Sequence, residues 1–163
     1  MTDEAAKVGQ VHVPAGRDRF QGQRKVFGSR IIDFKVSTLD TNGGLSISEV
    51  TDVLKGGPAR HLHHEQGEWF YVVESEYMVE VGGERYRLGP GDSVFAPRKL
   101  EHGWAHVGEG TGRLILALQP AGEIEAFFDE LAKLGDSPQH EELQRVFSIH
   151  GLELTGPPLS IDE

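Results

Sequence analysis

The chain has 163 residues, 37% of them apolar, which suffices for one domain with a single core, and its net charge of −10 at pH 7 disfavours nucleic acid and anionic membranes as partners. It contains no cysteine, so disulfides and thiolate metal sites are excluded, and a metal would need nitrogen and oxygen ligands. No apolar run approaches the length of a membrane span and no signal peptide is recognisable at the start, so we expect a cytoplasmic protein whose partner is a small molecule.

Residues 1–29 are polar and mixed, which is typical of a flexible or docked arm rather than a domain. From residue 30 to residue 120, short apolar or alternating runs are separated by glycine-rich turns, which predicts a mostly β domain. The expected strands are residues 30–38, 45–53, 69–73, 77–81, 85–88, 93–96, 103–107 and 113–119. Eight short strands are typical of a β-barrel or jelly roll, and Gly82-Gly83 predicts a tight hairpin between two of them.

After this β region the periodicity becomes helical, which predicts a C-terminal helical tail over residues 121–163. A first amphipathic helix is expected to end at Gly135. Ser137 and Pro138 are the residue types of an N-cap and a first-turn proline, so we expect a second helix to begin there and to end at Gly151. Each helix carries one apolar face, so both are expected to pack on the outside of the barrel.

A group of ligand-type residues lies inside the β region. On an extended chain, residues two apart point the same way, so His61 and His63 can face one ion while His64 points elsewhere. Glu68 has an odd offset from His63, so the chain must turn in between, and Gly67 is expected to allow that turn. Glu68 is then the polar residue of an apolar inward row, and a buried carboxylate needs a cation or hydrogen bonds.

His102, which follows a short loop, would supply a fourth ligand from a neighbouring strand. Three imidazoles and one carboxylate suit one divalent first-row transition metal, that is iron, nickel, copper or zinc, with manganese and cobalt also possible. Four protein ligands leave room on the ion for water, dioxygen or substrate. The alternative is a cluster of solvated surface histidines, which four donors at this spacing between β-like runs disfavour.

These residues resemble the two motifs of the cupin family. The first motif is His61-x-His63-x4-Glu68, leading into an apolar strand, and the second is Gly91-x5-Pro97-x-Lys99-x2-His102-x3-His106. The resemblance spans roughly residues 45–119. It implies a cupin β-barrel, also called a double-stranded β-helix or jelly roll, with the metal ligands His61, His63, Glu68 and His102. Ser75 and Lys99 stand where the motifs usually have glycine, and His106 replaces an asparagine, so the loop conformations there are open.

A substrate pocket is expected beside the metal. The inward row supplies Phe70, Val72 and Phe95, whose apolar side chains would suit an aromatic substrate. Trp104 and His106 share alternation with His102 and could line the same cavity. Trp104 could instead be plain core packing, and His106 could be a partner of a metal ligand, a substrate contact or a core histidine satisfied by backbone.

Two further segments are the run Pro120-Ala121-Gly122, which leads into a helix with Phe127-Phe128, and the ending Gly151-Leu152-Glu153-Leu154-Thr155-Gly156-Pro157-Pro158-Leu159. They are similar, more weakly, to the tails of bacterial quercetinase-like cupins, a group that includes flavonol dioxygenases. That likeness implies a dioxygenase in which Glu68 both binds the metal and accepts the substrate's hydroxyl proton. The alternatives are a cupin isomerase or decarboxylase that consumes no oxygen, and a non-catalytic cupin that binds a small molecule. The resemblance also implies a homodimer, with the arm or a sheet edge at the interface.

Overall fold

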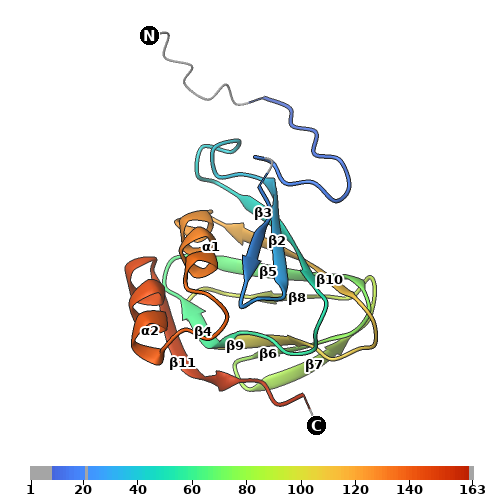
Figure 1. Ribbon diagram of the computed structural model, residues 1–163, viewed down its shortest axis with the longest axis vertical. Coiled ribbons are helices and arrows are strands. Elements are labelled where there is room, and N and C mark those ends of the chain that lie inside the picture. Colours follow the sequence, from blue (N-terminus) through green and yellow to red (C-terminus); the bar gives the residue numbers. More distant parts are fainter. Residues whose placement is uncertain (1–8, 21, 162–163) are drawn as a thin grey trace.

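The computed structural model describes residues 9–20 and 22–161 as two antiparallel sheets and two helices. The six-stranded sheet runs in the order β1 (Arg24–Val26), β2 (Arg30–Val36), β3 (Ser46–Asp52), β10 (Gly112–Gln119), β5 (Gly67–Glu74) and β8 (Ser93–Ala96). The five-stranded sheet runs in the order β11 (Leu152–Pro158), β4 (Ala59–His63), β9 (His102–His106), β6 (Tyr77–Val81) and β7 (Glu84–Leu88). Figure 1 shows the sheets stacked as a jelly-roll barrel, which confirms the expected fold.

The core lies between the sheets because side chains alternate along the central strands. In β3 and β10 every second residue is buried, as period two requires when one face of a strand covers the core. Leu114, Leu116 and Leu118 of β10 are buried, and Leu116 lies opposite Phe70 of β5. The inward row starting at Glu68 therefore continues as core.

The hairpin predicted at Gly82-Gly83 is confirmed. Val81 pairs with Glu84, so two residues connect β6 to β7, and Gly82 and Gly83 have φ angles of 58° and 87°. Two successive left-handed residues twist the hairpin in the sense that the strands need, and glycine adopts that conformation at little cost.

Both ends of the chain contribute strands that the sequence did not reveal. Within the predicted arm, β1 pairs with β2, and just before it the buried Asp18 accepts a hydrogen bond from the backbone N–H of Phe34 at 2.6 Å. Of the predicted arm, residues 1–8 and 21 lie outside the described part. Within the predicted tail, β11 pairs with β4 and extends the five-stranded sheet.

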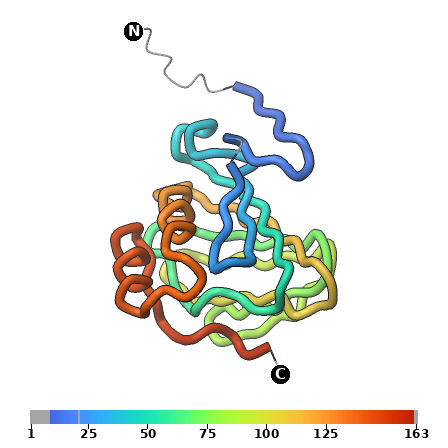
Figure 2. The backbone as a smooth tube through the Cα atoms, in the orientation of Figure 1, coloured from blue at the N-terminus to red at the C-terminus, as the bar shows by residue number. Residues whose placement is uncertain are grey.

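The helices are α1 (Ile124–Lys133) and α2 (His140–Ile149), which lie side by side along one flank of the barrel (Figure 2). Gly135 follows α1 in a left-handed conformation, as predicted for a helix end. The start predicted for the second helix was wrong: Gln139 is the N-cap, so α2 begins after Ser137-Pro138 rather than with them. Among the described helices, neither is long and apolar enough to cross a membrane.

Candidate metal centre

Four donor side chains meet at one end of the barrel. They come from β4 (His61 and His63), from the start of β5 (Glu68) and from the start of β9 (His102), and their ligand atoms all lie within 4.8 Å of one another. All four side chains are buried. Antiparallel pairing brings them together, because His61 lies directly opposite His102.

Strand alternation places the donors as expected. His61 and His63 point inward from β4, while His64 is exposed beyond its end. In β5, Glu68 and Phe70 are buried whereas Trp69 between them is half exposed.

The role predicted for Gly67 needs correction. The chain bends at His64 and Glu65, and Gly67 is already the first residue of β5, with no left-handed φ. A Cβ atom on Gly67 would lie 2.7 Å from the ring of Phe95. Glycine therefore leaves room there for the ring of Phe95, which a larger residue would displace, and it is not needed for the turn.

Each imidazole is held through its Nδ1 atom. The Nδ1–H groups of His61 and His102 donate to the carbonyl oxygens of Ala59 (2.7 Å) and Leu100 (3.2 Å), and that of His63 donates to Oε1 of Gln66 (2.9 Å). Because carbonyl and amide oxygens only accept, Nδ1 must carry the proton in all three rings. Nε2 is left as the atom available to a metal, the arrangement that orients histidine ligands in metalloproteins.

Burial and mutual contacts shift the pKa values of these side chains. Burial alone would lower the pKa of His63, but the carboxylate of Glu68 outweighs it and raises that pKa. The pKa of His61 is lowered to about 3 by burial and by the imidazoles of His102 and His63, so this ring is a neutral donor at physiological pH. Burial alone would raise the pKa of Glu68, but His63 and His102 outweigh it and lower that pKa, which keeps the carboxylate ionised.

Two contacts test whether a metal fits. Oε2 of Glu68 lies 2.9 Å from Nε2 of His102 and 3.0 Å from Nε2 of His63, so three ligand atoms already surround one point. Nε2 of His63 is buried, and none of the described residues gives it an aligned hydrogen bond. With the proton on Nδ1, this Nε2 and the Glu68 oxygen 3.0 Å away are two acceptors facing each other, and a divalent ion would satisfy both. The donor set fits a first-row divalent ion.

The centre adjoins a small cavity of about 50 Å³ that is lined almost entirely by apolar side chains. His61, His63 and Glu68 form its polar end. Helix side chains form another wall, including Phe127 and Phe147, whose rings meet edge to face at 4.8 Å. The helices therefore do more than cover the outside of the barrel. A cavity of this size has room for roughly three or four water molecules.

Among the predicted pocket residues, only Trp104 lines this cavity. Phe70 and Val72 are fully buried in the core, and the ring of Phe70 packs against that of His102 at 5.8 Å. Phe70 therefore packs against a metal ligand, and neither residue lines the cavity.

The expectation for Phe95 was wrong. Ala96 and Val94 lie opposite the inward-facing Glu68 and Phe70, so Phe95 lies opposite Trp69 on the outer face and is 58% exposed.

His106 is also outside the cavity. Four residues of strand, roughly 13 Å, separate it from His102. Its Nδ1–H donates to the carbonyl oxygen of Leu54 at 3.1 Å, and its Nε2 lies 3.0 Å from Oγ of Ser75. It is a core histidine satisfied by its neighbours.

The two unusual motif positions keep the backbone that glycine would adopt. Ser75 and Lys99 both have φ of 68°, in the left-handed region that non-glycine residues adopt at a cost. The N–H of Lys99 donates to the carbonyl oxygen of His63 at 2.7 Å, so this strained loop holds the end of a ligand-bearing strand.

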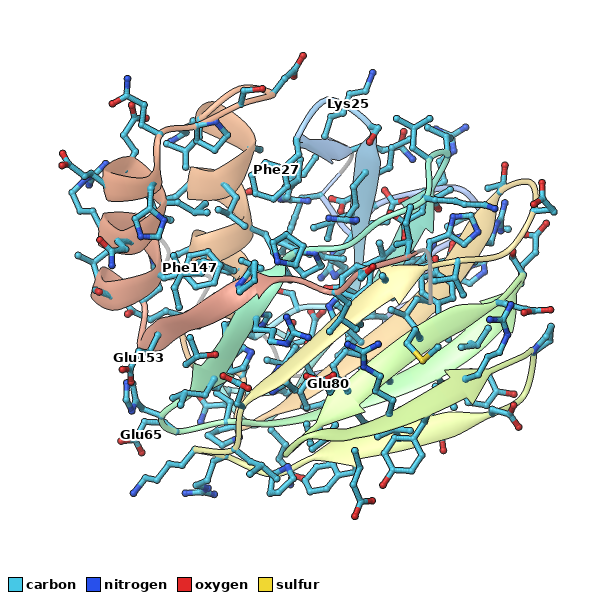
Figure 3. All side chains as sticks on the ribbon, turned by 90° about the horizontal axis from the view of Figure 1, so that it is seen from below. Lys25, Phe27, Glu65, Glu80, Phe147 and Glu153 are labelled. Atoms are coloured by element: carbon cyan, nitrogen blue, oxygen red, sulfur yellow. The ribbon has the colours of Figure 1, made fainter. Side chains whose placement is uncertain are left out.

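Three residues near the site were missed by the sequence analysis. Gln66 orients His63, Arg30 lines the cavity, and Phe147 packs against the ring of His61 at 5.6 Å. Phe147 projects from α2 toward the sheets in Figure 3. Nothing in the local pattern singles out Gln66 or Arg30, because their roles depend on segments far away in the chain.

Comparisons with known proteins agree with this architecture. The family model described as "Cupin domain" matches residues 50–118. An RmlC-like cupin from Shewanella frigidimarina is 28% identical, with a TM-score of 0.56, over 71% of this chain and 96% of that one. KdgF from Halomonas sp. is 23% identical, with a TM-score of 0.56, over 69% of this chain and 94% of that one.

A third structure extends the likeness to almost the whole chain. Pac13, described as a nucleoside dehydratase, is 10% identical, with a TM-score of 0.57, over 95% of this chain and 98% of that one. At that identity the likeness is one of fold alone. No curated protein matches the sequence.

Proposed function

Since this chain carries a cupin domain with a convergent His-His-Glu-His centre, we propose that it is a metal-dependent enzyme, a dioxygenase acting on a small enolic or aromatic substrate. The observation that carries the proposal is the position of this cluster of four buried donors, three of which (His61, His63 and Glu68) form the polar end of an apolar cavity. Such a cavity excludes water from a reactive centre and leaves one end for coordination.

The chain's own groups would divide the work. His61, His63 and His102 would hold the ion through Nε2, and a bound first-row ion would supply Lewis acidity toward an enolate oxygen and, for a redox-active metal, reactivity toward dioxygen. Glu68 is the only carboxylate among the described residues that line the cavity. It would therefore accept the hydroxyl proton of the substrate.

The size of the cavity narrows the substrate. Room for a few water-sized groups suits a small enol or keto acid, whereas a flavonol is several times larger and would require the helix wall to move. We therefore favour a small enol or keto acid over a flavonol as the substrate.

The same geometry also supports a reaction without oxygen. A carboxylate beside a Lewis acid can move a proton between carbon and oxygen, as an isomerase or decarboxylase requires. Oxygen consumption separates this second candidate from the first.

We also propose that the protein is a homodimer. β8 is an edge strand of the six-stranded sheet, and the outer face beside it carries Phe95, Trp69 and Tyr71, with the last two rings stacked at 5.3 Å. A second copy related by a twofold axis would cover this apolar edge with the same surface.

The deciding experiment measures metal content in the purified protein and then oxygen uptake with a panel of small enols, keto acids and flavonols. We expect one equivalent of metal in the native protein and in His64→Ala, which removes an exposed imidazole, and loss of metal in His63→Ala. A metal-loaded protein that consumes no oxygen but converts a panel member supports the second candidate. A protein that takes up no metal contradicts both.

A further inference from the structure

We propose that Arg30 binds the anionic end of the substrate at the neck of the cavity, so that the enzyme selects small molecules carrying a carboxylate opposite their metal-binding end. This inference rests on the proposed function, because it assumes that the other end of the substrate lies at the metal centre. It adds a substrate class and a residue that selects it.

Arg30 lies where the cavity meets the outside. A surface groove of about 850 Å³ runs beside the cavity, between the β1–β2 turn, the loop before β4, the start of α2 and β11. Five residues line both spaces: Phe27, Arg30, Pro58, Ala59 and Leu143. Arg30 is the only charged residue among the five, so a ligand passing from the groove to the metal centre meets one cation on its way.

The guanidinium of Arg30 is fixed in place but not fully used. Its Nε donates to Oδ1 of Asp52 at 2.8 Å, its Nη2 donates to the carbonyl oxygen of Gly56 at 3.2 Å, and its plane lies over the ring of Trp104 at 4.7 Å. Its Nη1 donates to none of the described residues and is not among their fully enclosed unpaired atoms, so it keeps some contact with solvent although the side chain is only 11% exposed. A rigid guanidinium with a free N–H edge is a prepared site for a carboxylate.

Asp52 positions Arg30 but leaves its Nη1 able to bind an anion. This carboxylate is 2% exposed, and its second oxygen accepts a hydrogen bond from the hydroxyl of Tyr77 at 2.8 Å. The hydroxyl of Tyr77 thereby stabilises part of the negative charge of Asp52, and Arg30 does not have to neutralise all of it. What remains at Nη1 is a hydrogen-bond donor with positive character in nearly apolar surroundings, where such a donor discriminates strongly against neutral groups.

The residues that line the groove also favour an anionic ligand. The chain has 26 acidic residues, yet none of the residues lining the groove is acidic, while Arg30, Lys55 and His140 are basic. Lys55 pairs at 3.0 Å with Glu109, which is almost fully exposed, so that pair is screened by solvent. The groove therefore offers an approaching anion a lining without carboxylates on this strongly acidic protein.

The test uses the full-length protein loaded with Co²⁺, whose visible spectrum reports a change of ligands. Two probes are compared: malate, which can chelate through its hydroxy acid end and place a second carboxylate at the neck, and 2-hydroxybutanoate, which lacks that carboxylate. We expect native protein to bind malate at least tenfold more tightly, the effect of one charge-assisted hydrogen bond. Equal affinity for the two probes in native, Co²⁺-loaded protein overturns the role of Arg30 and leaves the metal centre intact. Absence of Co²⁺ binding instead overturns the proposed function itself.

Variants distinguish loss of the malate preference from loss of the folded structure. Arg30→Gln alone would leave Asp52 buried without its cation, so the informative variant is Arg30→Gln combined with Asp52→Asn, which removes both charges. We expect it to bind one equivalent of Co²⁺ and to lose the preference for malate. Arg113→Gln, which removes a cation from the outer face of β10, should keep that preference. If the double variant does not fold, Arg30→Lys replaces it, since lysine keeps the charge but loses the planar donor edge, and a malate preference kept in full there contradicts the proposal.

Discussion

The side-chain amide of Gln66 ties the metal ligand His63 to the segment that leads into the helices. Its Oε1 accepts the Nδ1–H of His63 at 2.9 Å, while its Nε2 donates to the carbonyl oxygens of Pro120 and Ala121. Gln66 is itself buried, so both ends of the amide are committed. One residue thereby fixes the orientation of a ligand and the approach of the chain to the cavity wall.

Gln66→Leu should weaken metal binding about 10- to 100-fold, as loss of a group that orients a histidine ligand does. It should also destabilise the fold by about 1–3 kcal/mol, because the buried carbonyl of Ala121 loses its donor and the buried Nδ1–H of His63 loses its acceptor. Metal titration and chemical denaturation measure the two effects. Gln139→Leu is the matched control, since that exposed side chain makes no capping hydrogen bond. Unchanged metal affinity in Gln66→Leu would show that His63 does not need this partner.

Glu68→Gln should retain metal at reduced affinity and lose turnover by at least about 100-fold, because an amide can bind an ion weakly but cannot accept a proton. The comparison is Glu65→Gln, whose carboxylate points outward beyond β4 (Figure 3) and should leave both properties unchanged. Metal analysis and steady-state kinetics on the same preparations separate binding from proton transfer. Full turnover in metal-loaded Glu68→Gln would remove the base role.

Lys99→Gly should stabilise the protein by about 1 kcal/mol, because glycine adopts a φ of 68° without the steric cost paid by lysine. Arg98→Gly, the same kind of change at the preceding exposed residue, which has no left-handed φ, should destabilise it slightly. Thermal unfolding of the two variants side by side provides the measurement. Destabilisation by both changes would mean that the gain in chain entropy outweighs the relief of strain.

Phe147→Ala should enlarge the cavity beside His61 and cost about 3–5 kcal/mol of stability, since this ring is buried against Phe127 and His61. The same change should admit larger ligands to the metal centre, which binding of catechol to Co²⁺-loaded protein can show. Phe20→Ala, at a ring that is 45% exposed, should change neither property. Tighter binding of malate but not of catechol would contradict the view that this ring limits ligand size.

Phe95→Glu should convert a dimer into a monomer, because it places a charge on the exposed apolar edge beside β8. Light scattering coupled to gel filtration gives the mass, and circular dichroism checks that the barrel is intact. Tyr86→Glu, at a ring that is 40% exposed on β7, tests whether any added charge has the same effect. A native protein that is monomeric, or a Phe95→Glu variant that remains dimeric, moves the interface elsewhere.

The predictions agreed with the structure where they depended on the local periodicity of the sequence. Alternation along a strand is a property of neighbouring residues, so the shared face of His61 and His63 and the inward position of Glu68 followed from spacing alone. The prediction failed at Phe95, because the face of a strand that points inward depends on the register with the neighbouring strand. In this register Ala96, not Phe95, lies opposite Glu68. The predicted strands also lacked β4 and the two edge strands β1 and β11, whose pairing depends on the strands beside them.

The sequence by itself therefore determined the donor set, the absence of sulfur ligands and the mostly β fold, since all three depend on residue types and short spacings. Only the tertiary structure decided what surrounds the donors. Gln66 donates a hydrogen bond to the backbone of Pro120, and Phe147 of α2 packs against His61. Arg30 contacts both Asp52 and Trp104. Each of these contacts joins residues that lie far apart in the chain. The ligands are local features of the sequence, whereas the size, polarity and selectivity of the cavity arise from contacts that exist only once the sheets and helices have packed.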